Sequence, residues 1–154
     1  MDSPETQLEA FIAKFSPDVA GQASAILATL AERLPTAHRL VYDNYNALAV
    51  GFSADDRASN GIVSIAVYPK WVSLFFLRGV GLDDPDGILR GDGSQVRHVV
   101  LNGPGDLDRP EIVAMLGRAL AAATKPLPAS GNGPLVIKSV SAKQRPRRPM
   151  AKPT

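Results

Sequence analysis

Residues 61–107 read GIVSIAVYPKWVSLFFLRGVGLDDPDGILRGDGSQVRHVVLNGPGDL, and this stretch decides the fold. Residues 62–68 are almost wholly apolar on both faces, which is typical of a central strand. A turn that begins at Pro69 follows, because proline presets the backbone angle that tight turns need. The apolar run over residues 71–77 then returns as the next strand. The stretch therefore predicts a β-hairpin that carries the only tryptophan of the chain, Trp71.

The flanking sequence supplies further strands and three helices. Residues 38–43, 47–53 and 96–101 have the composition or the alternation of strands. Apolar side chains at helical spacing predict two helices before the sheet, each starting at a Ser-Pro pair, and one helix after it that starts near Pro110. The predicted fold is thus α+β, with a mainly antiparallel five-stranded sheet packed by two N-terminal helices and one C-terminal helix.

The last part of the chain differs in composition from the rest. Residues 125–154 contain seven of the 17 basic residues and none of the 15 acidic ones, and they are rich in Pro and Gly. This predicts a folded domain over residues 1–124 and an irregular, mostly disordered basic tail over residues 125–154. Within the tail, residues 135–140 have strand propensity and suit pairing with an open sheet edge, in this chain or in a second copy that forms a homodimer.

Composition also excludes several classes of site. The chain has no cysteine, so disulfides, thiolate metal sites and cysteine nucleophiles are ruled out. Its N-terminus lacks the basic and apolar regions of a secretory signal, and no apolar run is long enough to span a bilayer. We therefore expect a cytoplasmic protein without a membrane partner.

Three segments in order carry a resemblance to a known family. YDNYNALAVGFS, IVSIAVYPKWVSLFFL and LDDPDGILRGDGSQVRHVVL, followed by a closing helix, resemble the YdhG-like domain family over residues 5–124. This is a family of domains of unknown function, some of whose members have been described as frataxin-like iron chaperones. The resemblance implies packed helices on an antiparallel sheet, and it makes iron a candidate cofactor. It assigns no functional residue to this chain.

The predicted ligand site lies between the first hairpin and the polar loop that follows Trp71. Aromatic rings and amides at a hairpin are common in ligand clefts, and guanidinium groups match carboxylates and phosphates. The arginines have an alternative explanation, which is pairing with the aspartates of their own loop. The candidate residues are Tyr42, Asn44, Tyr45, Trp71, Arg78, Arg90 and Arg97.

Two other sites have weaker patterns. Asp83, Asp84 and Asp86 are carboxylates that suit hard cations, but the same Asp/Pro/Gly composition is typical of a turn capped by its own backbone. The tail segment KQRPRR has the charge of a polyanion-binding segment, without interleaved aromatic residues for base stacking. The nucleic-acid candidates are Lys143, Arg145, Arg147 and Arg148.

No pattern in the sequence identifies a reaction. A nucleophile elbow of the form G-x-S-x-G is absent, and the glycine pairs lack the context of a phosphate-binding loop. The sequence therefore favours a non-enzymatic module that binds a small ligand or a metal ion. The alternatives are a nucleic-acid-associated protein that acts through its basic tail, and an enzyme of unknown reaction.

Overall fold

Two prolines mark the starts of the first two helices. In the computed structural model, which describes residues 2–149, α1 spans Pro4–Ala13 and α2 spans Pro17–Arg33. Each proline occupies the first helical turn, where its missing N–H leaves no hydrogen bond unmade. The Ser3 hydroxyl caps α1 by accepting the backbone N–H of Thr6 at 3.1 Å. These local signals confirm the predicted helix starts.

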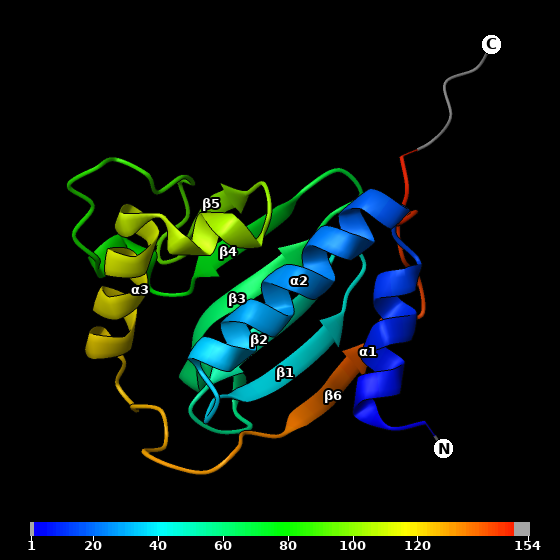
Figure 1. Ribbon diagram of the computed structural model, residues 1–154, viewed down its shortest axis with the longest axis horizontal. Coiled ribbons are helices and arrows are strands. Elements are labelled where there is room, and N and C mark those ends of the chain that lie inside the picture. The colour runs from blue at the N-terminus through cyan, green and yellow to red at the C-terminus, as the bar shows by residue number, and fades with distance from the viewer. Residues whose placement is uncertain (1, 150–154) are drawn as a thin grey trace.

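The strands form one mixed sheet in the order β5-β4-β3-β2-β1-β6 (Figure 1). Neighbours among the first five strands are antiparallel, and β3 and β4 form the hairpin around Pro69. The fold class and the five strands of the prediction are thus confirmed. The bounds are β1 His38–Asp43, β2 Leu48–Ser53, β3 Gly61–Val67, β4 Val72–Phe76, β5 Arg97–Leu101 and β6 Leu135–Val140.

The sixth strand corrects the predicted sheet. β6 pairs with β1 in parallel, from Arg39 opposite Leu135 to Asp43 opposite Val140, with a register shift after Val41. The strand propensity of this segment is satisfied at an edge of the sheet that would otherwise expose unpaired backbone groups. The structure therefore differs from the expectation of a mostly disordered tail, because residues 135–149 are placed against the domain.

The register divides the sheet into two unlike faces. One row across β1 to β5 consists of Val41, Val50, Ile65, Leu74 and Val99, all buried. These residues belong to the hydrophobic core, and the helices cover this face (Figure 1). We call the opposite side of the sheet the helix-free face.

The third helix completes the covered face. α3 spans Pro110–Ala122 and buries Ile112, Met115 and Leu116 in the same core as α2. Two short 3₁₀ turns position the connections around it: η3 Pro104–Asp108, which buries Leu107, and η2 Gly79–Gly81. None of the described helices is both long enough and apolar enough to cross a membrane.

A partly buried carboxylate ties the β2–β3 connection to the end of α3. Asp55 accepts the ammonium of Lys125 at 2.7 Å, the side-chain amide of Asn60 at 2.9 Å and the backbone N–H of Arg57 at 2.9 Å. The hydrogen bond from Lys125 is the largest of the effects that lower the pKa of Asp55, from 3.8 to about 2. The carboxylate therefore binds its proton less readily in the folded chain than in the unfolded one.

This shift predicts a specific loss of stability in acid. The stabilisation from Asp55 is fully present above the unfolded pKa of 3.8 and is lost as the pH falls through the folded value of about 2. We expect the free energy of unfolding, measured with urea, to fall more steeply with decreasing pH over this window in the wild type than in Asp55→Asn. Lys125→Gln should flatten the dependence in the same way. Identical pH profiles for the three proteins would contradict the assignment.

Candidate functional site

The Asp-rich loop forms a turn and does not gather ligands for a metal ion. The two carboxylate oxygens of Asp84 accept the backbone N–H groups of Ile88 and Leu89, at 2.9 and 3.0 Å. This is the capped-turn alternative of the sequence analysis. Residues 2–149 contain no group of three His, Cys, Asp or Glu residues placed to hold a metal ion. Asp83, Asp84 and Asp86 therefore do not fit an iron site.

The three arginines of the predicted ligand site line none of the hollows that its aromatic residues line. The guanidinium group of Arg90 donates to the carbonyl of Gly87 at 3.0 Å, and that of Arg97 donates to the carbonyl of Val96 at 2.8 Å. Arg78 donates to the hydroxyl of Thr124 beside a cavity of about 30 Å³, which has room for about one water molecule. Their guanidinium groups thus contact a threonine hydroxyl and backbone carbonyls. These contacts correspond neither to a shared ligand site nor to pairing with the loop aspartates.

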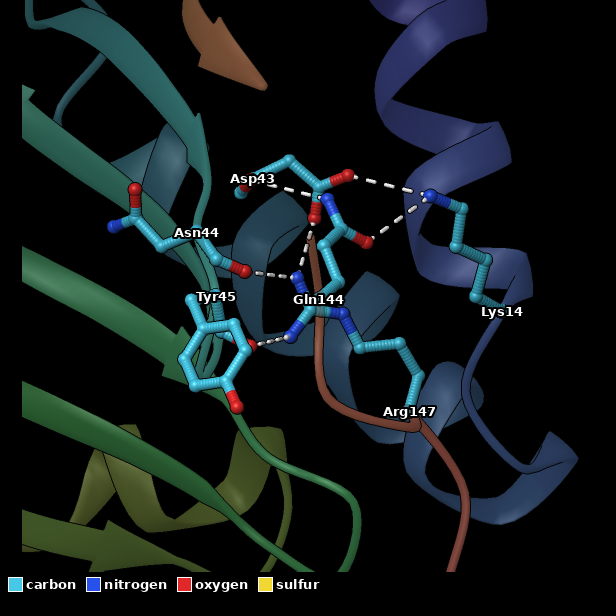
Figure 2. Close-up of polar contacts among 6 residues, drawn as sticks. All are labelled: Lys14, Asp43, Asn44, Tyr45, Gln144 and Arg147. Atoms are coloured by element: carbon cyan, nitrogen blue, oxygen red, sulfur yellow. Dashed lines mark hydrogen bonds and ion pairs between the residues drawn. The ribbon is translucent and has the colours of Figure 1, made fainter. Parts of the chain in front are cut away.

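A buried ion pair fixes the basic tail on the domain (Figure 2). Asp43, the last residue of β1, is fully buried, and its carboxylate accepts the guanidinium of Arg147 at 2.8 Å. Lys14 approaches the other oxygen of the same carboxylate at 3.4 Å. Arg147 is itself only 5% exposed. Its guanidinium therefore serves a structural contact in the folded chain, and a role for Arg147 in contacting nucleic acid stays a prediction.

Further hydrogen bonds lay the tail along the β1–β2 turn. Backbone N–H groups of Ser141 and Arg145 donate to the carbonyls of Asp43 at 2.8 Å and of Tyr45 at 2.9 Å. The side-chain amide of Gln144 donates to the carbonyl of Asp43 at 3.1 Å, as Figure 2 shows. Because the backbone is held on both sides of Gln144, the side chain of Arg145 has a defined place beside the turn.

The tail and two hairpin turns enclose a hollow that the sequence did not predict as a unit. We call it the aromatic hollow. The indole of Trp71 stacks on the ring of Tyr68 with a centroid separation of 4.8 Å, and the guanidinium of Arg145 lies 5.8 Å from the ring centroid of Tyr45. Trp71 and Tyr45 remain 42% and 48% exposed. The lining residues with rings or charges are Tyr45, Tyr68, Lys70, Trp71, Arg145 and Arg148.

The aromatic hollow opens onto a groove on the helix-free face, which we call the sheet groove. Tyr45, Asn46 and Tyr68 line both. The sheet groove then continues past Ser64 and Leu77 toward η1, Ala58–Asn60. Small residues of β2 and β3 form its floor, and larger residues of β1, of β4 and of the position after β4 form its walls. These are Ala49, Gly51, Ser64 and Ala66, and Leu40, Tyr42, Phe75 and Leu77.

Two tyrosines in this region stay neutral. Burial raises the pKa of Tyr42, which lines the sheet groove and whose hydroxyl is out of contact with solvent and has no hydrogen-bond partner among residues 2–149. Burial also raises the pKa of Tyr68 in the aromatic hollow. Both phenols therefore keep their protons at neutral pH and contribute apolar rings with a hydroxyl donor.

The structure thus brings together residues from two separate sequence hypotheses. Tyr45 and Trp71 belonged to the ligand site, whereas Arg145 and Arg148 belonged to the nucleic-acid segment. Asn44 lies next to the hollow in the β1–β2 turn, and its carbonyl accepts a hydrogen bond from Arg147. The strand propensity of residues 135–140 was the one signal that the tail returns to the sheet.

Comparison of the chain with protein-family models, with curated proteins and with solved structures finds no match in any of the three. The resemblance to the YdhG-like family therefore stays a prediction.

The tail attachment gives a matched pair of variants. Arg147→Met removes one partner of a buried ion pair, so we expect it to lower the free energy of unfolding by about 3 kcal/mol. Arg145→Met, two positions away and exposed, should change it by less than about 1 kcal/mol. Urea denaturation measures both. Equal stabilities of the two variants would show that the buried pair does not hold the tail.

Proposed function

We propose that this protein is a non-enzymatic binding module that takes a small anionic ligand with an apolar body in the aromatic hollow. One observation carries the proposal: aromatic rings and cations from distant parts of the chain converge there, and no carboxylate of residues 2–149 lines the hollow. The cations are Lys70, Arg145 and Arg148. A hollow that combines exposed aromatic surface with unopposed positive charge suits a ligand that is both apolar and anionic.

The lining supports binding in preference to catalysis. Within the described part of the chain, the hollow has tyrosine, tryptophan, proline, amide and basic side chains, and no Asp, Glu, His, Ser or Thr. Histidine is the commonest general acid or base, and a Ser or Thr nucleophile works with an adjacent base; of the other side chains used in such catalysis, the hollow has tyrosine and Lys70 without a histidine or carboxylate beside them among the described residues. Trp71 and Tyr45 instead offer flat surfaces on which a ring or chain of a ligand packs.

A second candidate is binding of single-stranded nucleic acid. The observation that favours it is the position of Tyr45 and Trp71 beside the exposed basic residues Arg145 and Arg148, since single-strand sites combine stacking rings with cations. The tail supplies Lys143 as a further exposed cation. Such binding should weaken steeply with salt, whereas binding of a singly charged ligand should weaken only slightly.

The only tryptophan provides a direct probe of the hollow. Titration with naphthalene-2-carboxylate, followed by the NMR signal of the Trp71 indole N–H, should give a saturable shift. 2-Naphthamide has the same ring system without the charge, and it should bind about tenfold or more weakly because it loses the charge-assisted hydrogen bonds.

Variants locate the effect in the hollow. Arg145→Gln/Arg148→Gln should weaken binding of naphthalene-2-carboxylate by about tenfold or more. Arg118→Gln/Lys143→Gln removes the same charge from residues that do not line the hollow, and it should leave the affinity unchanged. The proposal fails if the carboxylate and the amide bind equally, or if both double variants bind like the wild type.

A further inference from the structure

We propose that the ligand is an anionic amphiphile with one charged end and an extended apolar chain. The charged end binds in the aromatic hollow, and the chain lies in the sheet groove across β1 to β4. This inference rests on the proposed function and names the chemical class of its ligand. It concerns a free, monomeric amphiphile.

The first support is that the two depressions form one path. Tyr45, Asn46 and Tyr68 line the hollow and also the near part of the sheet groove. Ser64 and Leu77 line both the near and the far part of that groove. A ligand anchored at the hollow therefore has a continuous surface ahead of it along the helix-free face, and an extended chain follows such a surface better than a compact ring.

The second support is the distribution of charge along this path. Lys70, Arg145 and Arg148 all lie at the hollow, and among the residues that the structure describes no charged one lines either part of the sheet groove. A nucleic-acid strand that followed the path would place phosphates over an uncharged, mostly apolar surface. Since polyanion sites track the backbone with cations, the distribution favours a ligand with charge at one end only.

The third support is a glycine at the floor of the groove, where the absence of a side chain leaves space for a ligand. Gly51 lies inside β2 between Leu40 and Ser64, where glycine weakens a strand. Its φ is not positive, and an added Cβ would meet only the carbonyl oxygen of Leu40, at 3.8 Å. Neither backbone conformation nor crowding requires glycine here. Its effect is to leave space between the walls of the groove.

The walls of the groove are apolar over the same distance. Leu40 and Tyr42 rise from β1, and Phe75 and Leu77 rise from β4 and its end. The ring of Phe75 stacks on the imidazole of His98 in the neighbouring strand, with a ring-centroid separation of 5.1 Å. Removing a methylene of the ligand from water against such walls should tighten binding by about fourfold per methylene.

A chain-length series tests the inference. Hexanoate, octanoate, decanoate and dodecanoate are titrated at monomeric concentrations, again with the Trp71 indole signal. In the wild type the affinity should rise by about fourfold per methylene. Dodecanol, which has the chain without the charge, should bind about tenfold or more weakly than dodecanoate. No increase along the series would overturn the inference.

Filling the groove separates this inference from the proposed function. Gly51→Val should abolish the gain with chain length and leave binding of naphthalene-2-carboxylate at the hollow unchanged. Ala49→Val, also on the floor, gives a second variant if Gly51→Val does not unfold cooperatively. Val100→Leu adds bulk on the helix-free face outside the groove, because Val100 is 42% exposed and pairs with Ser73. It should behave like the wild type.

The remaining outcomes distinguish the proposed function from the amphiphile inference. If naphthalene-2-carboxylate binds but Gly51→Val and Ala49→Val keep the full chain-length gain, the proposed function stands and the amphiphile inference falls. If neither anion binds, both fall. If an oligothymidylate of ten nucleotides binds more tightly than dodecanoate with a steep dependence on salt, the ligand is single-stranded nucleic acid and the amphiphile inference is overturned.

Discussion

The ion pair between Asp43 and Arg147 is the contact on which the arrangement of the site depends. The two residues are 104 positions apart, and both are almost fully removed from solvent. A buried charge without its partner is costly, so each residue requires the other in place. The pair therefore holds the end of the tail against the end of β1. Together with β6, it joins residues 135–149 to the sheet.

The functional consequence of this contact lies on its exposed side. The buried guanidinium of Arg147 fixes the backbone, while Arg145 and Arg148 on either side of it point outward and are exposed. They stand opposite the rings of Tyr45 and Trp71, which the two hairpin turns supply. A tail of the same composition that hung free would give no defined hollow. The same short segment thus supplies both a structural anchor and the charge of the site.

Local sequence patterns were sufficient for most of the fold but not for the site. The Ser-Pro helix starts, the apolar stripes and the hairpin at Pro69 are local features, and the structure confirms them. The strand at residues 135–140 was also visible, but its partner and its parallel direction depend on β1, far away in sequence. Asp43 and Arg147 lie in segments with no shared local pattern. Composition placed Arg147 in a disordered tail, although pairing with a buried carboxylate leaves it buried against the domain.

The most direct measurement is native-state hydrogen exchange of the backbone amides of Ser141 and Arg145, which donate to the carbonyls of Asp43 and Tyr45. We expect slow exchange of both in the wild type. In Arg147→Met both should exchange at least about tenfold faster, whereas Ile65, in the middle of the sheet, should remain the slowest of the three to exchange. Unprotected Ser141 and Arg145 amides in the wild type, or protection that the variant does not change, would contradict the account.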